Sequence, residues 1–139
     1  MSCSATSNPF TRTCNEILTL NKSIRFVGVA NNLGTLLATS YREGLTPLMT
    51  IEETRHYAVQ AVLRAAIRED FVGKSGKLKH SIGTYDRLIR ATVPIITEGS
   101  LQDQSKFFLL LSFDIGTDVK DIIENKLLPY VDKNIKSFK

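Results

Sequence analysis

Apolar residues recur at two different spacings along this chain, and the two spacings predict its secondary structure. Three segments carry apolar residues three or four positions apart, which is typical of amphipathic helices; they are 9–20, 51–71 and a segment that begins after Thr117. Other segments are short, apolar and bounded by turn residues, which is typical of strands; they are 24–30, 35–41, 78–84, 87–96 and 106–115. The predicted order is helix, two strands, helix, three strands and helix.

Residues at the ends of the first two helices fit known capping patterns. Asn8 can accept the first free amide of a helix that Pro9 opens. Thr50 and Glu53 have the spacing of a capping box, in which each side chain accepts the other residue's backbone amide. Gly73 follows the apolar pattern of the long helix, so we expect it to be the C-terminal cap.

Turn residues and one proline predict the remaining connections. Residues 31–34, Asn-Asn-Leu-Gly, form the turn between the first two strands, because Asn and Gly accept a positive φ. A short turn near Tyr85 links the third and fourth strands. Thr117 is the expected cap of the final helix. Pro129 lies inside the apolar pattern of that helix and indicates a kink or a restart.

The stretch FFLLL at 107–111 has no alternation of apolar and polar residues. Such a run predicts a strand that is buried on both faces. A five-stranded antiparallel sheet with the strand order 2-1-5-4-3 satisfies the connections and places this strand at the centre. We therefore predict a three-layer α/β (α+β) fold, with the long helix on one face of the sheet and the terminal helices on the other.

This order of elements resembles the roadblock and profilin-like group of folds, which includes longin domains. More closely, several stretches resemble an uncharacterised family of archaeal proteins; they are Ile24–Tyr41, Tyr41-Arg42-Glu43-Gly44, Pro47-Leu48, Tyr57–Arg64 and Tyr85–Pro94. The resemblance covers residues 20–131. Roadblock-like domains in general are dimeric platforms for small GTPases and their regulators. They carry no catalytic constellation, so the resemblance implies no catalytic residues here.

Length and cysteine content predict one small intracellular domain. The chain has 139 residues, the size of a single domain. We expect 1–8 to be a disordered tail and 9–139 to be one roadblock-like domain. Cys3 and Cys14 have no partners at metal-ligand spacing and are interpreted as free thiols. The sequence shows neither a membrane span nor a secretory signal. We therefore expect a cytoplasmic protein without membrane insertion.

Short motifs give little support for catalysis or cofactor binding. The stretch 73–75, Gly-Lys-Ser, ends like a phosphate-binding loop. That loop requires a glycine five positions earlier, where Arg68 stands, and it joins a strand to a helix. His56 and His80 have no nucleophile or acid at a recognisable spacing. We expect no catalytic residue, no cofactor and no metal site, and interpret the protein as non-enzymatic.

The net charge of +4 is concentrated in the middle of the chain. The basic residues there are Arg64, Arg68, Lys74, Lys77, Lys79, Arg87 and Arg90. Stacking aromatics are not interleaved with them, so nucleic acid is not an expected partner. Lys77 and Lys79 are interpreted as charges that protect an edge strand. Arg64 and Arg68 lie one helical turn apart and could clamp a carboxylate or phosphate; the alternative is a solvated surface.

The long helix carries more apolar surface than contact with one sheet requires. Beyond its sheet-facing side, Val59, Leu63 and Ile67 recur every four residues. Either the tail or a loop covers this stripe, or it is a partner surface, most simply for a symmetric second copy. The candidate interface residues are Val59, Leu63, Ile67, Gln60, Arg64 and Arg68.

Two functional hypotheses follow. The first is a non-enzymatic homodimer that acts as an interaction or regulatory module, with a small GTPase or another protein as its partner by resemblance. The alternative is a small-molecule sensor that binds its ligand between helix and sheet. A cavity above ~300 Å³ there would favour the sensor. An enzyme ranks third.

Overall fold

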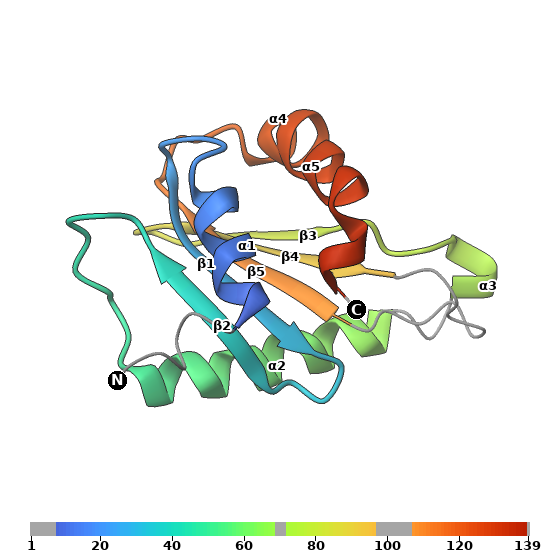
Figure 1. The fold of residues 1–139 in the computed structure, drawn as a ribbon. Coiled ribbons are helices and arrows are strands. Elements are labelled where there is room, and N and C mark those ends of the chain that lie inside the picture. The colour runs from blue at the N-terminus through green and yellow to red at the C-terminus, as the bar shows by residue number, and fades with distance from the viewer. Residues whose placement is uncertain (1–7, 69–71, 97–106, 139) are drawn as a thin grey trace.

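The computed structural model describes residues 8–68, 72–96 and 107–138, which form three layers (Figure 1). The helices are α1 (Pro9–Leu18), α2 (Ile51–Arg68), α3 (Val72–Ser75), α4 (Val119–Ile122), a π-helical turn (Ile123–Leu127), α5 (Leu128–Lys133) and a 3-10 turn (Ile135–Phe138). The strands are β1 (Ile24–Asn31), β2 (Leu36–Tyr41), β3 (Ser81–Thr84), β4 (Ile89–Ile95) and β5 (Phe107–Phe113). Helix α2 covers one face of the sheet, and α1 and the C-terminal helices cover the other.

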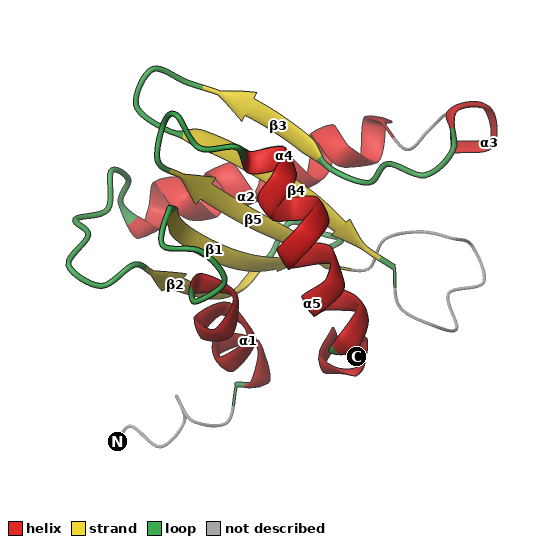
Figure 2. Ribbon diagram, turned by 90° about the horizontal axis from the view of Figure 1, so that it is seen from above, coloured by secondary structure: helices red, strands yellow, loops and turns green. Residues whose placement is uncertain are grey.

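The sheet has the predicted topology. Its strands are antiparallel and lie in the order β2-β1-β5-β4-β3 (Figure 2). Strand β5 is central, because Leu109 pairs with Val29 of β1 on one side and with Val93 of β4 on the other. Strands β2 and β3 form the two edges. The position of β3 matters for the candidate site described below.

Strand β5 is buried on both faces, which confirms the interpretation of its unbroken apolar run. Leu109 and Leu111 belong to the apolar cluster formed with α1 and the C-terminal helices. Phe108 and Leu110 belong to the cluster under α2. All four side chains are at most 2% exposed. Successive side chains of β5 still point to opposite faces of the sheet, but each face is covered by a helical layer instead of water.

Helix α2 lies close to the sheet because small side chains line its inner side. Ala58, Ala61 and Ala65 are at most 2% exposed. They pack in one cluster with Phe108 and Leu110 of β5. A methyl group extends only a short way from the helix backbone, so the helix axis can approach the strands closely. Val62 is also buried in this cluster, whereas Val59, Leu63 and Ile67 are left for the outer side of the helix.

Two of the three predicted N-terminal caps are confirmed. Asn8 accepts a hydrogen bond from the second residue of α1 at 2.9 Å. The amide of Glu53 donates to Thr50 Oγ1 at 3.1 Å, and the amide of Thr50 donates to Glu53 Oε1 at 2.9 Å. The third prediction is wrong: Asp118, not Thr117, caps α4, because its carboxylate accepts a first-turn amide at 3.2 Å. The charged carboxylate oxygen of Asp118 is a stronger hydrogen-bond acceptor than the hydroxyl oxygen of Thr117.

The segment before β3 also differs from the prediction. Gly73 does not cap the long helix; it lies inside the short helix α3. The positive φ, 85°, occurs at Gly76, where the chain leaves the helical turn. Strand β3 begins three residues later than predicted, and Leu78 packs against the cluster under α2 from outside the strand. Lys77 and Lys79 therefore precede β3 and do not lie on the edge that they are predicted to protect.

The C-terminal helical run continues through Pro129, by way of an irregular turn. This residue has no amide to donate, and it occupies the first turn of α5, where none is needed. The five residues before α5 form the π-helical turn. The apolar face survives this irregularity, because Ile123, Leu127 and Val131 are at most 6% exposed. The sequence predicts a kink or a restart at Pro129 and not a helix end, and the helical run indeed continues past this residue.

The remaining ends of helices and strands lie within two residues of the predicted ones. Helix α1 ends at Leu18 instead of residue 20, and β4 spans Ile89–Ile95 instead of 87–96. Such shifts are common at the ends of elements. Residues 1–7 of the predicted tail 1–8, the predicted helix end at 69–71 and the predicted loop at 97–105 lie outside the described residues. Asn8 is described and caps α1.

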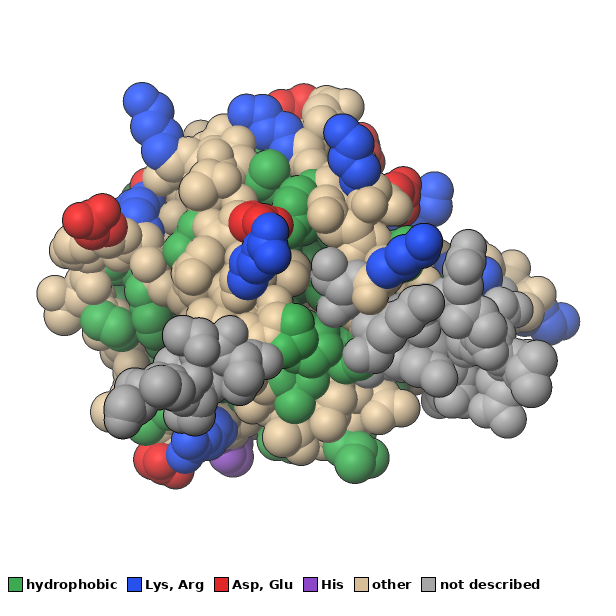
Figure 3. All heavy atoms as spheres, in the orientation of Figure 1, with side chains coloured by type: hydrophobic (Ala, Val, Ile, Leu, Met, Phe, Trp, Pro, Cys, Tyr) green, Lys and Arg blue, Asp and Glu red, His purple; other side chains and the backbone are tan. Residues whose placement is uncertain are grey.

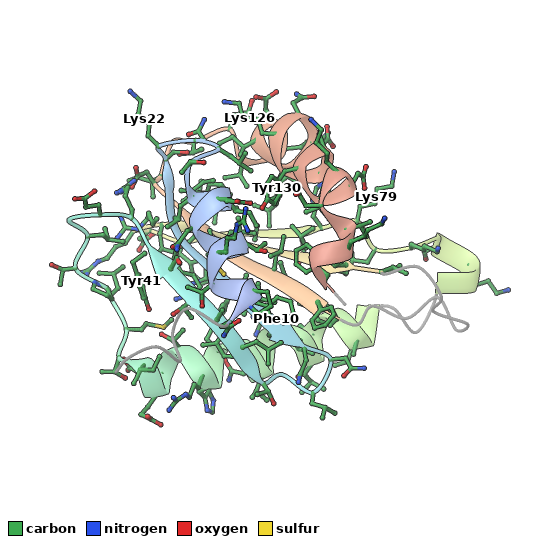
Figure 4. The ribbon with its side chains drawn as sticks, in the orientation of Figure 1. Phe10, Lys22, Tyr41, Lys79, Lys126 and Tyr130 are labelled. Atoms are coloured by element: carbon green, nitrogen blue, oxygen red, sulfur yellow. The ribbon has the colours of Figure 1, made fainter. Side chains whose placement is uncertain are left out.

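Hydrogen-bond and aromatic contacts join α1 to the C-terminal helices. The hydroxyl of Tyr130 donates to Glu16 Oε1 of α1 at 2.5 Å. Phe10, Phe107 and Phe138 form an aromatic cluster, with ring centroids 5.2–6.3 Å apart. Figure 4 shows Tyr130 and Phe10 on this side of the sheet. This face of the sheet is therefore closed by contacts within the chain.

Candidate functional site

Three large apolar side chains are exposed along the outer side of α2. Val59, Leu63 and Ile67 are 51%, 59% and 58% exposed. They cannot reach the sheet, because Ala58 and Ala61 already occupy the inner side of the helix. The described residues together cover less than half of each of these three side chains. The structure thus places the predicted stripe on the surface of the chain.

The turn between β1 and β2 extends this apolar surface. Gly34, at φ 85°, packs so closely on α2 that a Cβ added to it would lie 2.9 Å from the Cα of Val59. A side chain at this position would force the turn away from the helix. The neighbouring Leu33 is 81% exposed. The turn therefore brings a further exposed apolar residue close to Val59, the first residue of the stripe.

Polar side chains border the stripe. Gln60 and Arg64 are exposed on α2. Arg68 is the last residue of the helix, and its side chain lies outside the described residues. In Figure 3, α2 runs along the lower edge, where apolar and charged side chains both reach the surface. An apolar centre with a polar rim is typical of protein interfaces.

Of the other candidate residues, His56 and residues 73–75 are exposed, whereas His80 is half-buried. His56 is exposed on α2, and His80 Nε2 lies 3.9 Å from a carboxylate oxygen of Glu124. The stretch 73–75 lies between a helix and a strand, the reverse of the order in a phosphate-binding loop. Within the described ranges, we find no group of three or more His, Cys, Asp or Glu residues that could hold a metal ion. In those same ranges, every helix is too short or too polar to cross a membrane.

Two arginines and two tyrosines line a groove between α2 and the β3 edge of the sheet. The Cζ atom of Arg90 lies 4.1 Å from the ring centroid of Tyr57 and 5.6 Å from that of Tyr85. Arg64 approaches Tyr57 from the helix, at 5.9 Å. Cation–π attraction holds the guanidinium group of Arg90 against the ring of Tyr57. Burial raises the pKa of the Tyr57 hydroxyl although both arginine charges lower it.

Small side chains of β3 leave this groove open. Ser81 and Gly83 pair with Thr92 and Arg90 of β4 and share their face of the sheet. Helix α2 packs on β1, β5 and β4, so β3 extends beyond its cover. The groove has a volume of about 290 Å³.

This groove is not predicted from the sequence. Arg64 and Arg90 belong to the expected basic set, but Tyr57 and Tyr85 are not assigned a role there. Tyr57 and Arg64 lie two helical turns apart and so share one side of α2, which is a signal present in the sequence. The sequence does not show that this side of α2 lies over β4, because the position of the helix on the sheet depends on tertiary packing.

A second pocket lies between the start of α2 and the sheet. It is lined by apolar side chains that include Phe26, Tyr41 and Leu111, and its volume is about 40 Å³. A binding site for a small molecule is typically about 300 Å³ or larger. This pocket is therefore too small to be the ligand cavity that the sensor alternative requires.

No protein-family model matches the sequence, and no curated protein matches it. Several solved structures are similar in fold. MglB from Myxococcus xanthus has a TM-score of 0.69 at 13% identity, over 95% of this chain and 96% of that chain. A roadblock/LC7 domain from Streptomyces avermitilis has a TM-score of 0.62 at 11% identity, over 91% and 97%. An MglB in a tetrameric arrangement has a TM-score of 0.62 at 15% identity, over 82% and 79%.

At these identities the likeness is one of fold. The neighbours cover most of this chain, and the chain covers most of each neighbour. The five-stranded sheet of order β2-β1-β5-β4-β3, with helices on both faces, is the arrangement that the resemblance to roadblock-like domains predicts. The chain therefore has the roadblock/LC7 fold.

Proposed function

We propose that this chain is a non-enzymatic, homodimeric protein-interaction module, and that two copies meet through the outer side of α2. The observation that carries the proposal is the exposure of Val59, Leu63 and Ile67. Contiguous apolar patches on soluble proteins mark interaction sites when they are rimmed by polar residues. A two-fold symmetric dimer is the simplest arrangement, because one patch serves both copies.

The size of the stripe limits the expected affinity. Full burial of a Val, Leu or Ile side chain contributes about 1.5–3 kcal/mol, and about half of each side chain is still exposed here. Two copies of the stripe would thus contribute about 5–9 kcal/mol. Association costs roughly 4–15 kcal/mol in lost freedom of motion. We therefore expect a moderate affinity, to which Leu33 and the polar rim must also contribute.

The further partner of such a dimer is proposed from the fold. Roadblock-like domains in general are platforms for small GTPases and their regulators, and the chain has this fold. One of its structural neighbours, an MglB, has a tetrameric arrangement, which supports self-association as a property that the fold can carry. In our proposal, the two copies together present a composite surface that a small GTPase binds.

The test is the substitution Leu63→Glu. This residue is at the middle of the stripe, so the substitution places two carboxylates near the symmetry axis, where each loses water and repels the other. We expect the Leu63→Glu variant to be a folded monomer at a protein concentration of about 100 µM. This concentration is well above a micromolar dissociation constant, so the wild-type protein should be dimeric. Sedimentation measures the mass, and circular dichroism measures the helix content. Ile51→Glu is the control, because Ile51 is also exposed on α2 and a carboxylate in the first turn is favourable.

Three outcomes would contradict the dimer. The wild-type protein could sediment as a monomer at that concentration. Leu63→Glu could leave the mass unchanged, or the control Ile51→Glu could dissociate the protein equally. If the dimer is confirmed, the immobilised wild-type protein should retain a small GTPase from native cytosol, identified by mass spectrometry, and Leu63→Glu should retain much less. Equal retention would place the GTPase surface elsewhere.

A further inference from the structure

Ser112 is a buried polar residue in an otherwise apolar strand. Strand β5 has the sequence FFLLLSF, and Ser112 is 7% exposed. Its neighbours across the sheet are Phe26 of β1 and Arg90 of β4, and all three side chains point to the face under α2. Because serine is much smaller than phenylalanine or arginine, a hollow remains between these two side chains. This hollow is the pocket of about 40 Å³ at the start of α2.

The hydroxyl group of Ser112 has no hydrogen-bond partner among the residues that the structure describes. Buried hydroxyl groups are nearly always paired, and an unpaired one destabilises a fold. Ser40 of β2 is buried to a similar extent, and its hydroxyl donates to Asn15 Oδ1 at 2.5 Å. Ser112 therefore differs from an ordinary structural serine, and it lines the pocket.

The same pocket carries positive charge that the described carboxylates do not fully neutralise. Arg25 and Arg90 both line it. Arg25 shares the carboxylate of Asp114 with Arg42. No carboxylate of the described residues lies within ion-pair distance of Arg90, whose Nη2 donates to the sulfur of Met49 at 3.2 Å. A thioether is a weak acceptor, so a carboxylate would be a much stronger partner for this guanidinium group.

We propose that this pocket binds the carboxylate group of a glutamate side chain from a partner polypeptide, which accepts hydrogen bonds from Ser112 and Arg90. On the same scale of volume one water molecule requires about 10–15 Å³. The pocket therefore has room for about three non-hydrogen atoms, the number in a carboxylate group. The aliphatic stem of the glutamate would contact Phe26 on the pocket wall. The inference does not depend on the proposed dimer, because no residue of the stripe lines the pocket.

The rim of the pocket favours a polypeptide over a free carboxylate ion. Pro47 and Leu48 line the pocket and are exposed, Leu48 at 55%. An acetate ion would fill the pocket and leave this apolar rim in water. A polypeptide with apolar residues beside its glutamate would bury the rim as well, which is favourable. It would also exclude water from the contact between the carboxylate and Arg90, which strengthens that contact.

The test uses the capped peptide acetyl-Leu-Glu-Leu-amide, with acetyl-Leu-Gln-Leu-amide as its control and sodium acetate as the free carboxylate. Amide chemical shifts of the full chain, read at Ser112 and Leu48, measure binding. We expect the glutamate peptide to bind at millimolar concentration and to shift both signals. The glutamine peptide should not bind, and acetate should bind about tenfold more weakly than the glutamate peptide. Arg90→Gln should weaken binding of the glutamate peptide about tenfold, whereas Arg55→Gln, on an exposed part of α2, should not change it.

The substitution Ser112→Ala separates a binding role from a structural one. It removes an unpaired hydroxyl, so the melting temperature should stay the same or rise, while binding of the glutamate peptide weakens about fivefold. Ser40→Ala is the matched control, because it removes a buried hydroxyl that is paired. This control should lower the melting temperature and leave binding unchanged.

Several results would overturn the proposal. They are equal binding of the two peptides, binding of acetate as tight as that of the glutamate peptide, and no shift at a peptide concentration of about 10 mM. A Ser112→Ala variant that loses stability as Ser40→Ala does, and binds like the wild type, would show that the hydroxyl group is structural. Leu63→Glu tests the dimer separately, so a wild-type protein that is monomeric but binds the glutamate peptide would contradict only the proposed function.

Discussion

One carboxylate, that of Asp114, ties together three strands at one end of the sheet. Arg42, just after β2, donates to both of its oxygens, at 2.7 and 3.1 Å. Arg25 of β1 donates to Oδ1 at 3.1 Å. Asp114 itself follows the last residue of β5. The hydrogen bond from Arg42 is the main reason why the pKa of Asp114 lies below its ordinary value.

The effect of this carboxylate on stability should depend on pH. A carboxyl group with a lowered pKa in the folded state stabilises the fold above its ordinary pKa of 3.8 and loses that contribution as the pH falls through the lowered value. We expect Asp114→Asn to cost about 1 kcal/mol at pH 7, because the cluster is partly exposed. The difference from wild type should shrink below about pH 4. Urea unfolding at a series of pH values measures it, and a difference independent of pH would contradict the assignment.

Side chains that act on their own backbone are predictable from sequence, and those that act across the fold are not. The caps at Asn8 and Thr50 depend on residues within three positions. Thr117 and Asp118 are adjacent and both able to cap a helix, so the sequence does not distinguish Asp118, the observed cap, from Thr117, the predicted one. The contact between Arg90 and Tyr57 joins residues on β4 and α2. Its geometry depends on how the helix crosses the sheet, which no local pattern encodes.

At the scale of elements, the apolar run of β5 is the sequence feature that predicts most of the fold. A strand without a polar face requires helical cover on both sides, and this requirement fixes both the three layers and the central position of β5. The weakest prediction concerns β3, which begins three residues late. A short edge strand that pairs on one side has few apolar positions, so its periodicity is hard to distinguish from that of a loop.

The two-sided burial of β5 predicts that its two faces are equally sensitive to charge. Leu109→Asp buries a carboxylate under α1 and the C-terminal helices, and Leu110→Asp buries one under α2. Each should cost at least about 3 kcal/mol, from lost apolar packing and an unpaired charge. Ile115→Asp is the control, because Ile115 lies two residues beyond the strand and is 57% exposed. Thermal unfolding measures all three, and a near-wild-type melting temperature for either core variant would contradict the arrangement.

At the scale of the whole molecule, the two helical layers differ in how completely they are closed. The layer of α1 and the C-terminal helices is joined by Tyr130 and by an aromatic cluster, and its apolar residues are buried or half-buried. Among the described residues, α2 is the helix that covers the opposite face, and its stripe is exposed with an open groove beside it. Both proposed sites therefore lie on the same side of the sheet. In the proposed dimer the second copy would cover the stripe, so a further partner would have to bind beside it.

A dimer that forms through α2 also predicts how thermal stability depends on concentration. Association stabilises the folded state by mass action, so the melting temperature of the wild-type protein should rise with protein concentration. Leu63→Glu should abolish this rise, because the variant unfolds as a monomer. Its melting temperature should match that of very dilute wild-type protein, since Leu63 is exposed in the single chain. Scanning calorimetry over about a hundredfold range of concentration measures this, because a hundredfold excess over the dissociation constant adds about 2.7 kcal/mol. A melting temperature of the wild-type protein that stays constant over that range would show that two copies do not stabilise each other.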